Sequence, residues 1–377
     1  MNKVDTEYFR IVNDILTNGK LKKNRTGVDT IGIFGAQAKY NVDLNAFPLL
    51  TTKKVHWPAI VHELLWFISG DTNIKYLVDN NVRIWNEWAY KKYVDKCGAE
   101  VINTQDEFIQ KIKNDAEFAN KWGELGEGTY GGMWRAFPFY TMDDEFVGSS
   151  TVTGDLAEQW AFGQVDQLQK VINKLKTNPD DRRMIVSAWH PYWVDQCALP
   201  PCHCLFQFHT EELTQDERFD LYRESGGNKG WVSVPEMNEK VLNDANIPTR
   251  RLNCLLYQRS QDTALGNPFN VASYSLLTAM IAQSVNMTTG TFTHSTGDTH
   301  IYVSKSFDTS SYDSFNKQKL AVLGSAKNIM FFLDRDARGD FAGPVVGPAI
   351  QSFIKKPSDV NKILENVQSQ WDALPKN

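Results

Sequence analysis

Two periodicities of apolar residues run along this chain and constrain it to a packed mixture of helices and strands. From Glu7 to Thr17 apolar residues recur at helical spacing, and Gly19 is placed to end that helix. From Thr30 to Lys39 apolar residues alternate, as in a half-buried strand. Similar patterns predict helices over His56–Gly70, Asp71–Val78 and Ala272–Val285, and strands over Met184–Trp189, Cys204–His209, Leu252–Gln258 and His300–Val303.

Composition narrows the class of protein. A chain of 377 residues with 42% hydrophobic residues can bury a sizeable core. Its net charge of −5 provides no global basic field for duplex nucleic acid. The apolar stretches are too short to span a membrane, and the N-terminal residues lack the apolar core of a secretory signal. Five irregularly spaced cysteines indicate a reducing compartment rather than a disulfide framework. We therefore expect a cytoplasmic protein, in the host cytoplasm if the source is viral, that requires neither membrane nor nucleic acid.

Two polar segments are predicted to lie outside the core. Gly126 to Gly131 matches a dinucleotide-binding fingerprint in letters, but no convincing strand precedes it, so a glycine-rich loop over Gly123–Gly132 is the prediction. Thr210–Arg250 is rich in charge, Gly and Asn, and is typical of an insertion.

A nucleophile is indicated at Ala198-Leu-Pro-Pro-Cys-His-Cys. Two prolines hold Cys202 at the start of a predicted strand, where nearby positive charge would favour the thiolate. Arg182, Arg183 and Arg259 are candidates for that charge, and together they point to an anion such as phosphate. A buried structural cysteine is the plain alternative. A metal site is not expected, because Cys202-His-Cys204 lacks a second Cys/His pair.

Three other polar positions leave alternatives open. Glu63 lies in an apolar helix, where it is either paired or carries a raised pKa for acid–base work. Asn270 either caps the following helix or recognises an amide-like base edge. His300 and Tyr302 share a strand face and are either a core pair or substrate contacts.

These pieces occur in an order that resembles the thymidylate synthase family, which includes the deoxypyrimidine-nucleotide hydroxymethyltransferases of some bacteriophages. The resemblance covers about residues 5–90, 120–137, 180–208 and 252–304. Its motifs are Asn24-Arg-Thr-Gly, Phe47-Pro-Leu-Leu-Thr-Thr-Lys-Lys, His62-Glu-Leu-Leu-Trp-Phe, Gly70-Asp-Thr-Asn-Ile, Ile84-Trp-Asn-Glu-Trp, Tyr130-Gly, Arg182-Arg-Met-Ile-Val-Ser-Ala-Trp, Leu199-Pro-Pro-Cys-His, Tyr257-Gln-Arg-Ser, Leu265-Gly-Asn-Pro-Phe-Asn and Gly297-Asp-Thr-His-Ile-Tyr.

The resemblance implies a role for each matching residue. The implied catalytic residues are Cys202, which adds to C6 of the pyrimidine, Glu63 and Tyr130, which move protons, and Arg259 and Asn270. The implied substrate-binding residues are Arg25, Arg182, Arg183, Ser260, Gln258, His300 and Tyr302. The implied folate contacts, for 5,10-methylenetetrahydrofolate as co-substrate, are Trp85, Trp88, Asp262, Phe269 and Gly266.

The resemblance also implies an architecture. We expect an α+β fold in which a large mixed β-sheet is packed with helices, and two subunits that meet sheet to sheet. Residues 1–310 would form the catalytic domain, with an insertion at about 210–250, and 311–377 a divergent C-terminal segment. Arg182 and Arg183 would reach the nucleotide phosphate of the partner subunit.

The substrate and product follow from particular residues. Asn270 favours dUMP over dCMP, because cytosine-specific relatives carry an aspartate there. Four departures from typical synthases favour water, rather than hydride, at the last step: Met133, Val303-Ser-Lys, the segment Thr210–Arg250 and the ending Trp371-Asp-Ala-Leu-Pro-Lys-Asn. The sequence thus predicts a dUMP hydroxymethyltransferase. Thymidylate synthase is the alternative, and a non-catalytic RNA-binding relative is an alternative of a different class.

Overall fold

The computed structural model describes residues 3–23, 28–43, 45–51, 55–98, 101–141, 161–226 and 239–303. Arg25 and the predicted C-terminal segment 311–377 lie outside these ranges. The chain divides into two compact units. Unit 1 comprises the described parts of Met1–Val55, Leu175–Arg182 and Gln207–Asn377, and unit 2 those of His56–Lys174 and Arg183–Phe206.

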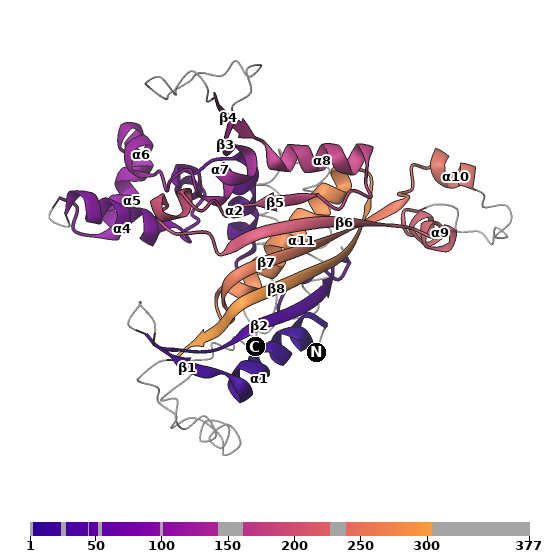
Figure 1. Cartoon of the computed structure of the whole chain (residues 1–377), viewed down its shortest axis with the longest axis horizontal. Coiled ribbons are helices and arrows are strands. Elements are labelled where there is room, and N and C mark those ends of the chain that lie inside the picture. Colours follow the sequence, from indigo (N-terminus) through magenta and orange to yellow (C-terminus); the bar gives the residue numbers. More distant parts are fainter. Residues whose placement is uncertain are drawn as a thin grey trace. The chain divides into compact units, whose positions relative to one another are not determined.

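The sheet of unit 1 is built around one long strand. Among the described residues the strand order is β1-β2-β8-β7-β6-β5. Figure 1 shows β2, β8, β7 and β6 side by side. The strands of unit 1 are β1 (Lys20–Lys22), β2 (Thr30–Asn41), β7 (Arg250–Asp262), β8 (Thr288–Tyr302) and the larger part of β6 (His203–Glu212).

Strand β8 makes the sheet mixed. It pairs antiparallel with β2, from Thr30 opposite Tyr302 to Asn41 opposite Thr291. On its other side it pairs parallel with β7, with a shift in register between Leu252 and Cys254. The expected mixed sheet packed with helices is therefore confirmed. β8 is much longer than the short strand predicted over His300–Val303. Its first part could not be recognised in the sequence, because the side chains there alternate between buried and partly exposed without being apolar.

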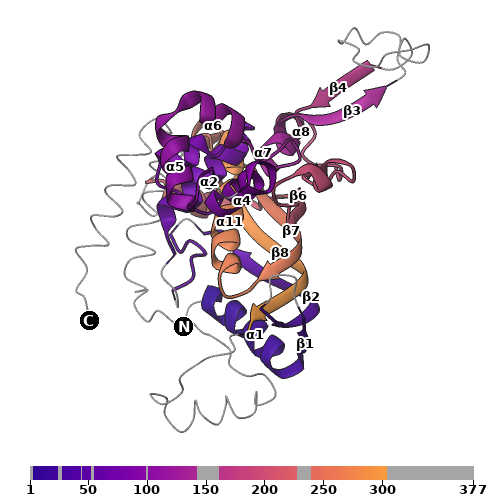
Figure 2. The same cartoon turned by 90° about the vertical axis from the view of Figure 1, so that its left-hand side faces the viewer.

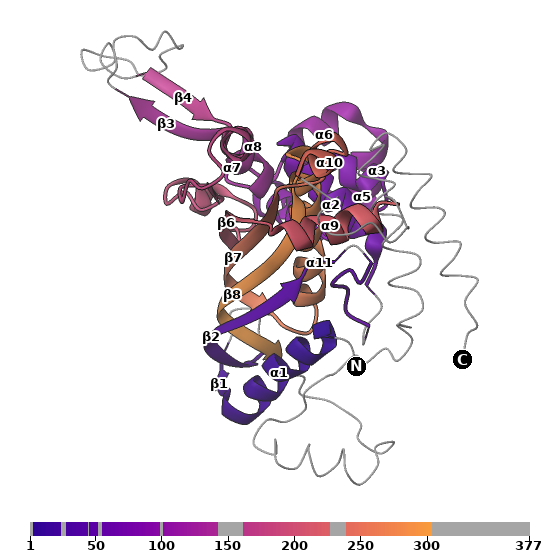
Figure 3. The ribbon, with the colours of Figure 1, turned by 90° about the vertical axis from the view of Figure 1, so that its right-hand side faces the viewer.

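Two helices cover one face of this sheet, as Figures 2 and 3 show. Helix α1 (Lys3–Asn18) places Tyr8, Ile11, Val12 and Ile15 in the core at helical spacing, and packs against β2. Helix α11 (Gly266–Ser284) is buried on most of its surface and packs against β7 and β8. It begins at Gly266, six residues before the prediction. The predicted first helix and its end before Gly19 are confirmed.

The segment predicted as an insertion is only partly separate. Its first three residues continue β6 to Glu212. Helices α9 (Gln215–Glu224) and α10 (Glu239–Asp244) follow and lie beyond the ends of β6 and β7 (Figure 1). Leu242 and Ile247 form a small core there with partly buried residues of α9, so this segment has apolar packing of its own.

Unit 2 is mainly helical. Its helices are α2 (Trp57–Ser69), α3 (Lys75–Asp79), α4 (Asn86–Cys97), α5 (Gln105–Asn114), α6 (Ala116–Trp122), α7 (Tyr130–Arg135), the 3₁₀ helix η2 (Trp193–Gln196) and most of α8 (Gln167–Thr177). β3 (Phe137–Thr141) and β4 (Ala161–Val165) form a two-stranded ribbon that extends past α7 and α8 (Figure 2). The short β5 (Ile185–Ser187) lies next to β6 in the strand order, and the amide of Ala188 donates to Cys204 O.

Three local predictions in unit 2 have distinct outcomes. The helix over His56–Gly70 is confirmed, with Pro58 in its first turn and Gly70 as its C-cap at φ +81°. The helix predicted from Asp71 starts only at Lys75, because the Asp71 carboxylate accepts from the Asn73 amide and forms a turn instead of a cap. The glycine-rich loop ends at Thr129, because Tyr130–Arg135 forms α7.

Candidate active site

A thiol cluster in unit 2 is centred on Tyr130 at the start of α7. We define it as Glu63, Trp85, Tyr130, Cys202 and His203. The Tyr130 phenol oxygen accepts from the backbone amides of Cys202, at 2.8 Å, and His203, at 3.3 Å. These bonds fix the backbone that carries Cys202 just before β6, and Cys202 itself is partly exposed.

The surroundings of Tyr130 keep its phenol protonated. Its ring centroid lies 4.8 Å from that of Phe67, 6.0 Å from that of Trp85 and 5.0 Å from that of His203. Burial is the main reason that the pKa of Tyr130 is well above its ordinary value, and electrostatic interaction with Cys202 adds to the rise. The Tyr130 phenol therefore keeps its hydrogen at neutral pH and is not a phenolate base.

Glu63, unlike Tyr130, has a side chain that can be either charged or neutral near neutral pH. It projects from α2, and the Trp85 indole N–H donates to its Oε1 at 2.8 Å. Burial raises the pKa of Glu63 to about 7, and the Trp85 hydrogen bond offsets only part of that rise. Of the two alternatives for Glu63, the structure supports both: it is paired, and its pKa is suited to acid–base work.

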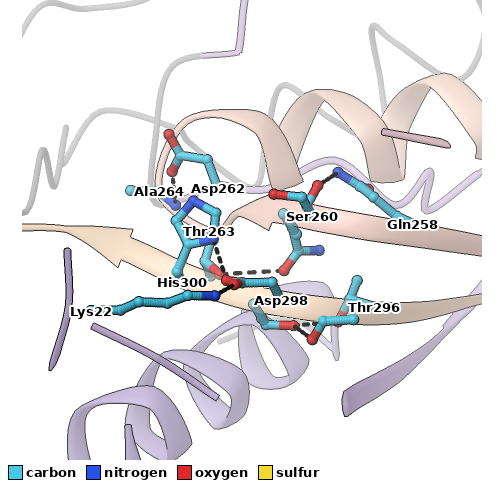
Figure 4. Close-up of polar contacts among 12 residues, drawn as sticks. Lys22, Gln258, Ser260, Asp262, Thr263, Ala264, Thr296, Asp298 and His300 are labelled. Carbon is cyan, nitrogen blue, oxygen red and sulfur yellow. Dashed lines mark hydrogen bonds and ion pairs between the residues drawn. The ribbon is translucent and has the colours of Figure 1, made fainter. Parts of the chain in front are cut away.

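A second group of polar residues lies in unit 1, on β1, β7, β8 and the first turns of α11. We call Lys22, Gln258, Ser260, Asn270, Asp298 and His300 the sheet cluster; Figure 4 shows most of it. Gln258 Nε2 donates to Ser260 O at 2.9 Å and to Asn270 Oδ1 at 3.2 Å. Asn270 lies within α11 and bonds to Gln258, so it does not cap the helix.

Asp298 holds His300 in the sheet cluster and is itself paired with Lys22. His300 Nδ1 lies 2.9 Å from Asp298 Oδ1, and the Lys22 ammonium lies 2.7 Å from Asp298 Oδ2 (Figure 4). Partial burial alone would raise the pKa of Asp298, but Lys22 and His300 outweigh it and leave that pKa below its ordinary value. Tyr302 packs edge-on against His300, with the ring centroids 5.3 Å apart. The prediction that His300 and Tyr302 share a face is thus confirmed.

The arginines predicted to bind an anion lie in different places. Arg182 and Arg183 are exposed, and Arg182 O accepts from Gln207 Nε2 at 2.9 Å. Arg259 is partly buried on β7, next to Ser260 of the sheet cluster. Among the residues predicted to bind the phosphate, Arg25 lies outside the described ranges.

The predicted folate contacts belong to both units. In unit 2, Trp85 is buried against Trp66, Phe67 and Tyr130, whereas Trp88 is partly exposed on α4. In unit 1, the Asp262 carboxylate accepts from the amides of Ala264 and Leu265 and shapes the turn from β7 into α11. Gly266 opens that helix, and Phe269 is partly exposed in its first turns.

Several neighbours of the predicted residues were not assigned roles from the sequence. Asp298 is part of a quoted motif and lies two residues before His300, so its place on the same face could have been inferred. Lys22, 276 residues away from Asp298, gave no such signal. Within the described ranges, no cluster of three or more His, Cys, Asp or Glu side chains is arranged to hold a metal. The described helices also include none with the length and apolarity that a membrane crossing needs.

Comparison with known proteins assigns the chain to a family. The family model of thymidylate synthase matches residues 6–311. Thymidylate synthase of Mycoplasma genitalium is 43% identical over 296 residues, which cover 78% of this chain and 80% of that protein. Thymidylate synthase of Mycoplasma pneumoniae is 42% identical with the same coverage, and that of Mesoplasma florum is 42% identical over 79% of this chain and 81% of its own. These matches confirm the resemblance seen in the motifs, and the chain belongs to the thymidylate synthase family.

Proposed function

We propose that this chain is a thymidylate synthase, which converts dUMP to dTMP with 5,10-methylenetetrahydrofolate as one-carbon donor. The observation that carries the proposal is the thiol cluster, in which a partly exposed cysteine, a buried phenol and a carboxyl group with a pKa of about 7 occur together in a chain of this family. The named relatives, at 42–43% identity, support the choice of reaction.

Cys202 is the nucleophile in this proposal. Its sulfur adds to C6 of the uracil ring, and the electron pair of the C5–C6 double bond moves toward O4, which makes C5 nucleophilic. Glu63 in its protonated form stabilises the negative charge that develops at O4. Its pKa of about 7 lets the same carboxyl group accept a proton later in the cycle.

Tyr130 has two functions here. It holds the backbone at Cys202 in place through the amides of Cys202 and His203. Since its pKa is raised, it assists removal of the C5 proton by orienting water rather than by taking the proton directly.

The remaining substrate contacts are assigned by motif. Arg25, Arg259 and Ser260 bind the phosphate, and Arg182 and Arg183 reach it from the second subunit of a homodimer. Their exposure in the single chain is compatible with that task. His300 and Tyr302 hold the 3′-hydroxyl group, while Asn270, supported by Gln258, pairs with N3 and O4 of uracil.

The residues fit a folate co-substrate. When bound, methylenetetrahydrofolate supplies the one-carbon unit and then the hydride that reduces it to a methyl group. Trp88 and Phe269, both partly exposed, offer aromatic surface to its flat ring. Trp85 supports Glu63, and Asp262 with Gly266 shapes the backbone beside Phe269.

The described residues offer no support for the hydroxymethyl product that the sequence departures favoured. Met133 is buried in α7, where its carbonyl accepts from Gln167, so it fills the core. Val303 is also buried, and its amide donates to Asp29 O. Ser304, Lys305 and the C-terminal residues lie outside the described ranges. The relatives named thymidylate synthase favour transfer of hydride, rather than addition of water, at the last step. They thus favour the methyl product over the hydroxymethyl product.

Product identification tests the proposal. Purified protein is incubated with dUMP and 5,10-methylenetetrahydrofolate, the nucleotide is identified by mass spectrometry and dihydrofolate is followed by absorbance. We expect dTMP with dihydrofolate in equal amounts. A hydroxymethyl nucleotide with tetrahydrofolate would overturn the methyl assignment, and turnover of dCMP instead of dUMP would overturn the substrate.

A pair of cysteine variants tests the nucleophile. C202S should abolish turnover and the covalent adduct with 5-fluoro-dUMP, because a hydroxyl group is a far weaker nucleophile than a thiolate. C97S, at another partly exposed cysteine, should leave both unchanged. Full turnover in C202S would overturn the assignment of Cys202 as nucleophile. Full function of a C202A protein in cells, without turnover in vitro, would favour the non-catalytic alternative.

A further inference from the structure

We infer that His294 is a specificity-determining residue, which acts through Gln258 to fix the amide of Asn270 in the orientation that accepts uracil and rejects cytosine. The inference rests on the proposed function, because Asn270 is assigned there to the base. It concerns a chain of four side chains in unit 1: Gln261, His294, Gln258 and Asn270.

The backbone carbonyl of Ser260 fixes the direction of the chain at one end. A carbonyl oxygen only accepts, so the group of Gln258 that faces it at 2.9 Å must be the amide nitrogen. The same nitrogen donates to Asn270 Oδ1 at 3.2 Å. The oxygen of Asn270 therefore faces Gln258, and its amide nitrogen lies on the other branch of the side chain.

His294 fixes Gln258 from the other side. Gln258 Oε1 lies 2.8 Å from His294 Nε2 and can only accept, so that ring nitrogen carries a hydrogen. In the neutral ring Nδ1 is then an acceptor, and it faces the Gln261 amide nitrogen at 3.4 Å. Each contact from Gln261 to Asn270 thus joins a donor to an acceptor in one consistent direction.

The position of His294 makes it a rigid anchor. It is 2% exposed in the middle of β8, and its ring stacks on Phe292 at a centroid distance of 5.6 Å. Phe292 in turn stacks on Tyr274 of α11 and Tyr40 of β2. A ring held in this way does not rotate to offer Gln258 a different atom.

The orientation of Asn270 decides between the two pyrimidines. Uracil offers an N3–H donor and an O4 acceptor, which match the second lone pair of Asn270 Oδ1 and the Nδ2 hydrogens. Cytosine offers an N3 acceptor and a 4-amino donor, which require the amide to be turned over. The turned amide would place Asn270 Nδ2 against Gln258 Nε2, donor against donor.

Without the His294 donor, Gln258 Oε1 is buried and unsatisfied. In the wild type the bonds to Ser260 and His294 both oppose turning Gln258 over, whereas without the His294 donor only the Ser260 bond opposes it. The turned Gln258 Oε1 accepts from a turned Asn270 Nδ2, and that arrangement suits cytosine. The H294F variant removes the donor and keeps an aromatic ring on Phe292. H294Q restores an amide donor near the position of Nε2.

The test measures preference between nucleotides. Dissociation constants and kcat/KM for dUMP and dCMP are determined for the full-length wild type, H294F and H294Q, with T278V as control. T278V removes another buried hydrogen bond of unit 1, from Thr278 Oγ1 to Tyr274 O. We expect H294F to reduce the dUMP-over-dCMP ratio by about tenfold, the worth of one good hydrogen bond, H294Q to recover most of it, and T278V to leave it unchanged.

The outcomes separate the inference from the proposed function. An unchanged ratio in a folded H294F or H294Q protein, or an equal change in T278V, overturns the inference. A wild type that binds dUMP in preference to dCMP but makes no dTMP overturns the proposed function alone, since the binding ratios still test His294. A wild type that binds both nucleotides equally overturns the inference.

Discussion

At the scale of single residues, the thiol cluster shows how burial changes the titration of two neighbouring groups in different ways. Burial raises the pKa of both Glu63 and Tyr130. Because a carboxyl group starts well below neutral pH and a phenol well above it, the same effect brings Glu63 to about 7 and moves Tyr130 out of reach. Only Glu63 is left able to change its charge under ordinary conditions.

This difference predicts a pH dependence of stability. The folded-state pKa of Glu63 is raised above its unfolded value of about 4.5, so the folded protein keeps a proton that the unfolded chain has lost. Stability from this group is present below about pH 4.5 and is lost as the pH rises to about 7. Removing the carboxyl in E63Q should therefore make the urea midpoint less sensitive to pH across this window. Ionisation of the Glu63 carboxyl group lowers the free energy of unfolding by at most about 1.4 kcal/mol per pH unit.

Urea unfolding at about pH 5 and about pH 8 measures this difference. An E63Q midpoint that falls with pH as steeply as that of the wild type would contradict it. Under the proposed function, E63Q also has an activity readout, because loss of a general acid–base group costs roughly 10²–10⁴ in kcat.

At the scale of elements, regular apolar periodicity predicts helices well, but it does not predict a strand whose buried side chains are polar. Helices α1 and α2 were found from their apolar spacing and their glycine ends. The first part of β8 was missed because its buried side chains include Thr296 and His294, which are satisfied by hydrogen bonds to Thr299 and Gln258. A pattern of apolar residues does not reveal such a strand.

The end of α2 gives a test at this scale. Gly70 has φ +81°, and an added Cβ would lie 3.0 Å from Arg135 Cβ of α7. Arg135 cannot easily withdraw, because it donates to Ile68 O and pairs with Asp166. G70A should therefore lower the free energy of unfolding by more than backbone strain alone, which is about 1–3 kcal/mol.

Gly226 is the control. It also has a positive φ, of +90°, and a Cβ there would meet nothing within 4 Å. G226A should show the backbone strain only. Equal losses in G70A and G226A, measured by urea unfolding, would mean that the contact with Arg135 adds nothing.

At the scale of the whole molecule, the sequence pointed to candidate site residues but not to the residues that contact and support them. The order of short motifs pointed to Cys202, Glu63 and Tyr130, and the structure places these three in one unit. The partners Lys22 and His294 could not be predicted, because each depends on strand register between distant parts of the chain. Such residues become visible only when the sheet is known.

Arg250 tests a long-range connection of this kind. Its guanidinium group, 14% exposed, donates to Asp180 at 2.7 and 3.0 Å, to Glu212 at 2.8 Å and to Thr210 at 2.9 Å. It therefore joins the start of β7 to the end of β6 and to the turn after α8. R250M should lower the free energy of unfolding by about 1–3 kcal/mol, since the buried Thr210 hydroxyl group and two carboxylates lose their donor.

A surface pair provides the comparison. Lys240 and Asp244 are both largely exposed on α10, and K240M should change stability by less than about 0.5 kcal/mol. Thermal unfolding of both variants measures the difference. An R250M protein as stable as K240M would show that the Arg250 bonds are exchanged for water without loss.

The position of β8 at the centre of the sheet has a consequence for how the chain is made. β2 is complete at Asn41, but its neighbour in the sheet begins only at Thr288. At about 5–20 residues per second, a ribosome needs tens of seconds to reach that strand. Throughout this time one edge of β2 stays open on the nascent chain, and an open edge readily pairs with other chains. Synthesis of this protein therefore depends on whatever shields β2 until β8 emerges.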